Sequence, residues 1–217
     1  MLFVTSACGL IIKYAAYIPH LTISQGIVLF TTTLLAAAYY KSNLLVIRGR
    51  SLREMYWLKP IVIGLVWTGF VFILPILFTS IIHNDIVNTP PFTALLFLKS
   101  VLFIGILAIL FDIKDVQSDI ENKMNTLILK LGFQSTLSYV ILPLILLELI
   151  IIITNFLLQN LLGWQMILIL IPFGLLTMAV FHLRKKRVLL FYLIGIDGLM
   201  LIKAVCGIIV YSSITFS

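Results

Sequence analysis

The sequence is poor in charged residues and almost free of cysteine. Only 11% of its 217 residues are Asp, Glu, Lys or Arg, whereas soluble domains contain about 25%. The two cysteines, Cys8 and Cys206, lie in apolar runs without CxxC spacing, so we interpret them as small buried apolar residues. These shortages exclude a soluble enzyme, a disulfide-rich secreted scaffold and a disordered tail.

Hydrophobic residues make up 62% of the chain instead. A membrane-spanning helix needs about 20 mostly apolar residues, and a backbone in lipid must satisfy its own hydrogen bonds, which favours helices for such long runs. A barrel would need alternating polarity, which runs such as 142–153 do not have. We therefore predict an all-α polytopic membrane bundle, a single transmembrane domain over residues 1–217 with about seven spans. The predicted spans are 2–19, 24–40, 60–82, 92–111, 135–155, 163–182 and 188–212.

The distribution of Lys and Arg predicts how these spans are oriented. Twelve of the 15 basic residues lie in the polar segments 41–59, 112–134 and 183–187. The other polar segments, 20–23, 83–91 and 156–162, contain no Lys or Arg. Because basic loops stay in the cytoplasm, we expect the N-terminus inside and the C-terminus outside the cytoplasmic membrane of a bacterium. We expect the basic clusters to contact anionic membrane lipids, and not nucleic acid.

Three carboxylates are concentrated in the run FDIKDVQSDIEN. Asp112, Asp115 and Asp119 lie within eight residues of a chain that has eight acids in total. On a helix, their spacing of i, i+3 and i+7 places them on one face. Like charges on one face repel one another unless a cation lies between them, and Mg²⁺ prefers oxygen ligands. We therefore predict that these three residues bind magnesium at the cytoplasmic end of the fourth span; the alternative is a solvated polar loop.

The same run resembles the second aspartate-rich motif of the UbiA superfamily of intramembrane prenyltransferases, D-x-x-D-x-x-x-D. In that family the motif is followed by Thr-Leu and a closing Leu-Gly, which correspond here to Thr126-Leu127 and Leu131-Gly132. Upstream, Tyr39-Tyr40, Leu58-Lys59 and the run 63–67 are similar to the family's segment around its fourth and fifth helices. The resemblance covers roughly residues 39–132.

The resemblance implies a fold, a reaction and a set of site residues. The family has nine helices around a cavity in which Mg²⁺ and basic residues stabilise a departing diphosphate, while the prenyl group moves to a lipophilic, commonly aromatic, acceptor. It implies that Asp115 and Asp119 are magnesium ligands with Asp112 beside them. The residues expected to contact the diphosphate are Arg48, Arg50, Arg53 and Lys123.

The chain also departs from the family pattern. No Asp precedes Asp85, so the family's first aspartate-rich motif and the two helices before it have no counterpart, and Ile128 replaces the usual proline after Thr-Leu. Two interpretations stay open: a magnesium-dependent prenyltransferase, or a non-catalytic protein of the same fold that binds lipid or a partner subunit. A small transporter is a third interpretation, but we find no inverted repeat in support of it.

Five charged residues fall inside the predicted spans. They are Lys13, Lys99, Glu148, Asp197 and Lys203. A lone charge at the centre of a span costs at least about 2.5–3.5 kcal/mol on insertion scales. We therefore expect these side chains to face the interior of the bundle, with at least one pair of opposite charges between helices.

Overall fold

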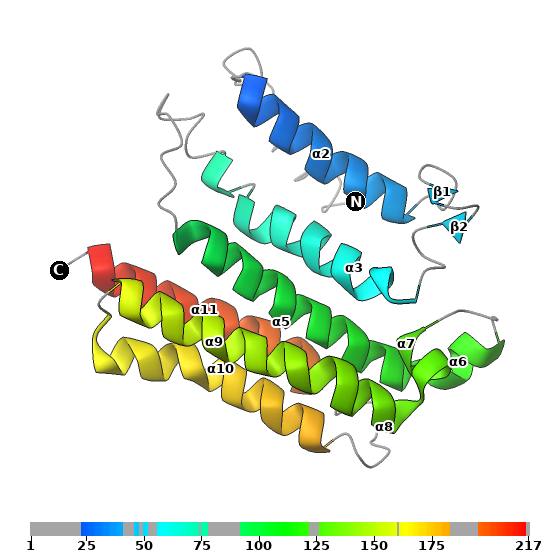
Figure 1. Ribbon diagram of the computed structural model, residues 1–217. Coiled ribbons are helices and arrows are strands. Elements are labelled where there is room, and N and C mark those ends of the chain that lie inside the picture. Colours follow the sequence, from blue (N-terminus) through cyan, green and yellow to red (C-terminus); the bar gives the residue numbers. More distant parts are fainter. Residues whose placement is uncertain are drawn as a thin grey trace, which may run out of the picture.

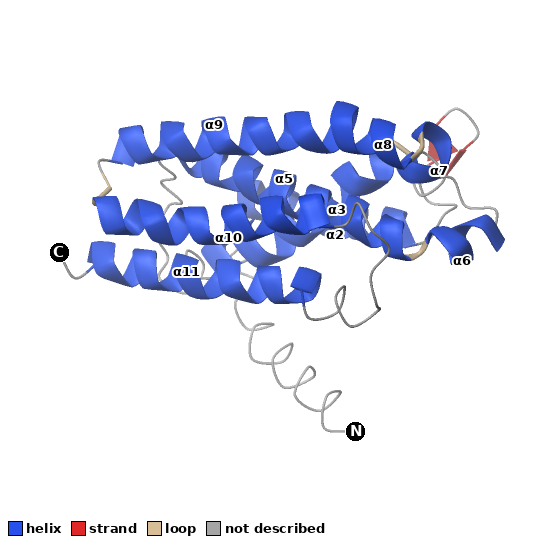
Figure 2. Cartoon of the chain, turned by 90° about the horizontal axis from the view of Figure 1, so that it is seen from below, coloured by secondary structure: helices blue, strands red, loops and turns tan. Residues whose placement is uncertain are grey.

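A computed structural model shows the chain as a bundle of long helices lying side by side (Figures 1 and 2). The structure describes residues 23–40, 46–47, 50–51, 56–73, 75–77, 92–121, 126–159, 161–182 and 195–215. The predicted all-α class is confirmed for these residues, apart from a short antiparallel ladder between β1 (Val46–Ile47) and β2 (Arg50–Ser51). The predicted span 2–19 lies outside the described residues.

Long helices form the body of the bundle, and shorter ones cluster at one end. The long helices are α2 (Ile23–Tyr40), α3 (Leu58–Thr68), α5 (Phe92–Lys114), α9 (Leu142–Gln159), α10 (Gly163–His182) and α11 (Asp197–Thr215). The short ones are α6 (Val116–Glu121), α7 (Leu127–Leu131) and α8 (Phe133–Thr136). Two π-helical segments, η3 (Gly69–Ile73) and η4 (Leu137–Ile141), continue α3 and join α8 to α9.

Four helical stretches of the described residues are long and apolar enough to cross a membrane. They are Leu58–Leu77, Phe92–Lys114, Phe133–Gln159 and Gly163–His182, and each coincides with a predicted span. The predicted span 24–40 matches α2 apart from Ile23, and 188–212 contains most of α11, but neither helix is among these four stretches. Large apolar side chains such as Leu157, Met178 and Leu201 point outward and are exposed. An outer surface of this kind is compatible with a multi-pass membrane protein.

Helix α5 lies at the centre of the bundle, where it packs against α3 on one side and α9 on the other. Every residue from Phe103 to Leu110 is buried. This stretch is apolar around the whole helix, which is the pattern of a helix enclosed on all sides. Around it the core is completed by Leu137 and Ile141 of η4, Ile145 of α9, Leu176 and Val180 of α10, and Leu199 of α11. The enclosure brings the polar C-terminal end of α5 to the edge of the core.

A glycine lets α3 approach α5 closely. A Cβ atom placed on Gly64 would lie 2.7 Å from the backbone carbonyl oxygen of Val101, a separation that real Cβ atoms essentially never show. Glycine is therefore required where these two backbones pack. The close approach holds the first turn of α3 beside the last turn of α5, where the candidate site begins.

The helix ends that adjoin the predicted basic segments lie together. The C-terminal ends of α2, α5 and α10 lie at the end of the bundle that carries β1, β2 and α6 (Figure 1). The loop joining α9 to α10 lies at the opposite end, which is also where the C-terminus is drawn. This arrangement matches the predicted alternation of basic and uncharged connections, while the side of the membrane that each end faces stays a prediction.

Candidate functional site

The three predicted magnesium ligands lie where α5 passes into α6. Helix α5 ends at Lys114, Asp115 forms a turn, and α6 begins at Val116. Backbone hydrogen bonds from the Asp115 nitrogen to the Phe111 oxygen (3.2 Å) and from the Asp119 nitrogen to the Asp115 oxygen (2.8 Å) keep the helical pattern through this turn. The acids therefore retain nearly helical spacing, although α5 is longer than the predicted span 92–111.

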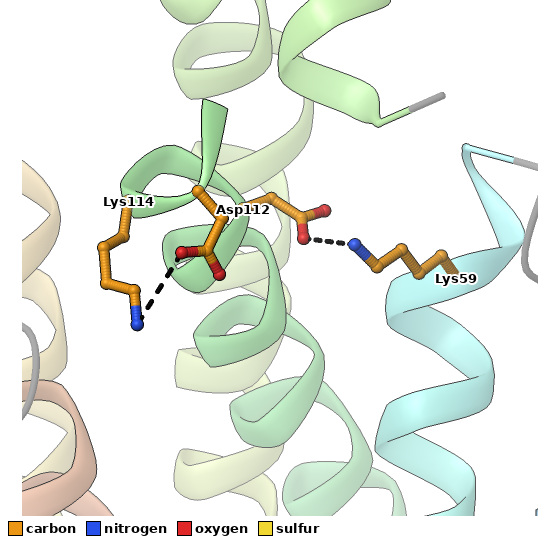
Figure 3. Close-up of polar contacts among 4 residues, drawn as sticks. Lys59, Asp112 and Lys114 are labelled. Atoms are coloured by element: carbon orange, nitrogen blue, oxygen red, sulfur yellow. Dashed lines mark hydrogen bonds and ion pairs between the residues drawn. The ribbon is translucent and has the colours of Figure 1, made fainter. Parts of the chain in front are cut away.

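Asp112 is buried and already has a cationic partner. The side-chain ammonium of Lys59, on α3, donates a hydrogen bond to Asp112 Oδ1 at 2.5 Å (Figure 3). The two side chains are 17% and 8% exposed, so the pair is shielded from most of the solvent. Sequence reasoning placed Lys59 in a basic loop and missed this contact. The available signal was that Lys59 directly precedes the predicted span 60–82, while Asp112 directly follows the next span, 92–111. Both residues are therefore expected at the same end of the bundle.

Asp115 and Asp119 are in different surroundings. Asp115 is exposed, and one of its oxygens lies 3.7 Å from the ammonium of Lys114, which also lies over the ring of Phe111. Such surface pairs stabilise a protein little, so Asp115 remains accessible to a ligand. Asp119 is half-buried, and its Oδ2 atom is shielded from water without a hydrogen-bond partner among the described residues. An unpartnered buried acceptor costs about 1–3 kcal/mol, which makes Asp119 the clearest sign that a cation or donor binds here.

The donor set suits magnesium, but the three carboxylates do not face one another. Carboxylate oxygens are the ligands that Mg²⁺ prefers, and the free oxygen of Asp119 fits that role. Among the residues that the structure describes, however, no group of three or more Asp, Glu, His or Cys side chains is placed to hold a metal ion. Asp112 turns toward Lys59, while Lys114 lies on the opposite side in Figure 3. A magnesium site made by all three residues stays a prediction.

The predicted diphosphate ligands fall mostly beyond the described residues. Arg48, Arg53 and Lys123 lie outside them, and Arg50 begins β2, where it pairs with Ile47 of β1. The β1–β2 ladder and α6 lie at the same end of the bundle in both views (Figures 1 and 2). The backbone thus brings part of the predicted basic loop to the end that carries the acids.

A second polar cluster lies inside the bundle. Lys99 and Ser100 of α5, Glu148 of α9 and Lys203 of α11 line one pocket of about 120 Å³ whose walls are otherwise largely apolar. Glu148 is only 1% exposed, and its Oε2 atom has no hydrogen-bond partner among the described residues. The ammonium of Lys203 donates a hydrogen bond to Ser100 Oγ at 3.4 Å and lies 4.2 Å from the centroid of the Phe103 ring.

This pocket accounts for three of the five charges predicted to face the interior. Lys99, Glu148 and Lys203 come from three helices and line the same pocket, so these three charges face the interior as expected. They form no direct ion pair, because the ion pairs of the described residues are Lys59–Asp112 and Lys114–Asp115. Asp197, which begins α11, is exposed instead of facing the interior, and Lys13 lies outside the described residues.

No protein-family model matches this chain, and neither a curated protein nor a solved structure is significantly similar to it. The likeness of residues 39–132 to the UbiA superfamily therefore stays a prediction from their motif.

Proposed function

We propose that the chain is a UbiA-like membrane prenyltransferase that binds a prenyl diphosphate with Mg²⁺ where α5 meets α6. The proposal includes seven spans with the N-terminus in the bacterial cytoplasm. The observation that carries it is the unpartnered Oδ2 of Asp119, which lies one helical turn from the exposed carboxylate of Asp115. An exposed carboxylate beside an unpartnered one at the mouth of an apolar bundle suits a ligand with a metal-bound diphosphate head and a hydrocarbon tail.

Each part of the site has a distinct task in this proposal. Asp115 and Asp119 would hold the metal, which when bound supplies positive charge to stabilise the departing diphosphate. Guanidinium groups of the basic loop, including Arg50, would contact the diphosphate oxygens in bidentate fashion. The bond between the prenyl C1 and the diphosphate oxygen breaks, a bond from C1 to the acceptor forms, and the acceptor loses a proton.

The ion pair of Lys59 with Asp112 holds the helix that carries the proposed metal ligands against α3. Because the carboxylate of Asp112 is paired with Lys59 of α3, Asp115 and Asp119 are the two predicted ligands left to bind a metal. Lys59 also links the basic segment 41–59 to the helix that carries the acids. The pair is therefore expected to position Asp115 and Asp119 and not to bind the metal.

The test is magnesium-dependent binding of tritiated farnesyl diphosphate to the purified full chain in lipid nanodiscs. We expect saturable binding that EDTA abolishes and that falls at least tenfold when Asp115 and Asp119 are both changed to alanine. Glu121→Gln removes a neighbouring exposed acid at the end of α6 and is the matched control, with unchanged binding. Absence of magnesium-dependent binding to the wild-type chain would overturn the proposal.

A second candidate is a non-catalytic protein of the same fold that binds a lipid or a partner subunit. Two observations favour it: Asp112 is in an ion pair with Lys59, and no group of three carboxylates is placed to hold a metal among the described residues. The discriminating measurement is release of inorganic diphosphate from bound farnesyl diphosphate when total bacterial lipid extract supplies acceptors. Release that Asp115→Ala abolishes supports the enzyme, whereas binding without release supports the non-catalytic protein.

A further inference from the structure

We propose that the pocket between α5, α9 and α11 binds a small monovalent anion together with water, and that Lys99 and Lys203 are its cationic partners. This pocket is separate from the proposed diphosphate site. Lys99 and Asp112 are thirteen residues apart on α5, or roughly 20 Å at the rise of an α-helix. The inference therefore does not rest on the proposed function.

The charges that line the pocket do not balance. Lys99, Lys203 and Glu148 are its charged lining residues, and together they carry a formal charge of +1 when all are ionised. An uncompensated charge is costly in a span, where water is scarce and partners are few. One monovalent anion brings the sum to zero, and so does loss of a proton from one lysine. In the first case the pocket binds an anion, and in the second case it does not.

The contacts of the two lysines leave room for a ligand. Neither ammonium forms a direct ion pair with Glu148. Lys203 donates to Ser100 and faces the ring of Phe103, which leaves further N–H donors on its ammonium. Lys99 has no hydrogen-bond partner in the described part of the chain, although it lines the same pocket. Both lysines therefore have free N–H groups that can donate hydrogen bonds to an anion.

The carboxylate in the pocket also needs a partner. Glu148 is almost fully buried, yet its Oε2 atom accepts no hydrogen bond from the described residues. An anion cannot donate to this oxygen, but a water bound beside the anion can. The pocket volume of about 120 Å³ is ample for this arrangement, because one water takes about 30 Å³ in the liquid. A small anion such as a halide, with a water beside it, fits within this volume.

The apolar walls strengthen the attraction between the lysines and an anion. Phe72, Phe103 and Phe173 line the pocket beside the charged groups. Electrostatic interactions are stronger next to such low-dielectric walls than in water. An ammonium that lies beside aromatic rings and forms no ion pair therefore attracts a halide ion strongly.

The experiment measures chloride binding to the purified full chain in detergent micelles, from the excess line width of the ³⁵Cl NMR signal and its competition by bromide. We expect saturable broadening in the wild-type protein. Lys99→Met and Lys203→Met should each weaken binding at least tenfold, because the remaining lysine and Glu148 then balance. Lys114→Met removes a lysine at the end of the same helix, outside the pocket, and should leave binding unchanged.

Glu148→Gln tests whether the positive charge of the pocket controls anion binding. This variant raises the formal charge of the pocket from +1 to +2, so chloride binding should be retained or strengthened. Elution as a single species from a sizing column shows that each variant is folded. If Lys203→Met is unstable, Lys99→Met tests the proposal by itself, because either substitution leaves one lysine to balance Glu148. Lack of saturable broadening in the wild-type protein, or equal binding by Lys99→Met, would overturn the proposal.

Discussion

Lys59 and Asp112 join the first turn of α3 to the last turn of α5 through an ion pair. Each of these charges lies at the helix end where the helix dipole disfavours it, since a cation is unfavourable near an N-terminus and an anion near a C-terminus. Pairing offsets both disadvantages at once. The contact therefore fixes how α3 and α5 align at the edge of the core.

Removing one partner of this pair should destabilise the bundle. We expect Lys59→Met to lower the free energy of unfolding by about 2–3 kcal/mol, somewhat less than for fully buried pairs because Lys59 keeps some contact with solvent. Unfolding by SDS in mixed micelles measures the change. In a double-mutant cycle with Asp112→Asn, the two effects should couple by at least about 1 kcal/mol, and strict additivity would contradict the prediction.

Gly64 should not tolerate a side chain. Gly64→Ala places a methyl group against the Val101 carbonyl at the contact of α3 with α5, so the helices must separate. We expect a loss of about 1–3 kcal/mol, measured by the same SDS titration. Gly174→Ala in α10 is the matched control, because a Cβ atom there meets nothing within 4 Å. Equal effects of the two substitutions would show that helix propensity, and not close packing, controls the result.

The ring of Phe103 should stabilise the ammonium of Lys203. The centroid lies 4.2 Å from Nζ, within the range of a cation–π contact. Phe103→Leu keeps an apolar side chain in the core but removes the π face, so we expect a specific loss of about 1–2 kcal/mol. The measurement compares this substitution in the wild-type and Lys203→Met backgrounds. The same loss in both backgrounds would assign it to packing alone.

The two ends of the bundle should react with reagents on opposite sides of the membrane. Gln117 on α6 and Leu162 between α9 and α10 are both exposed and lie at opposite ends. In a background with Cys8→Ser and Cys206→Ser, we expect an impermeant maleimide to label Leu162→Cys in intact cells and Gln117→Cys only in inverted vesicles. The reverse pattern would overturn the predicted orientation, and labelling of both from one side would contradict the bundle's alignment with the membrane normal.

Part of the architecture followed directly from the sequence. The predicted spans 92–111, 135–155 and 163–182 coincide with long apolar helices, because spans of this kind are specified by length and local hydropathy. Helix α5 extends three residues beyond the predicted span 92–111, into the acidic run whose spacing already indicated a helix. Helix α5 continues to Lys114 because the backbone bonds carry on and the charge of Asp112 is satisfied by Lys59, a partner 53 residues away.

The candidate site was only partly predictable. The spacing of Asp112, Asp115 and Asp119 indicated a helical backbone, which is a local property and is seen in the bonds that continue through Asp115. It did not show that Asp112 turns to α3 while Asp119 keeps a free oxygen. Likewise, hydropathy indicated that Lys99, Glu148 and Lys203 need an interior environment, but not that they share one pocket.

The sequence alone determined that this chain forms apolar helices, that its basic segments alternate along the chain, and that its acids gather after one span, because each property depends on residues close together in the chain. The tertiary structure alone decided which charges meet. The paired Lys59 and Asp112 come from different helices, and so do Glu148 and Lys203, which line one pocket. Their meeting depends on how each helix is rotated and how closely it approaches its neighbour, and those are set by packing contacts such as Gly64 against Val101.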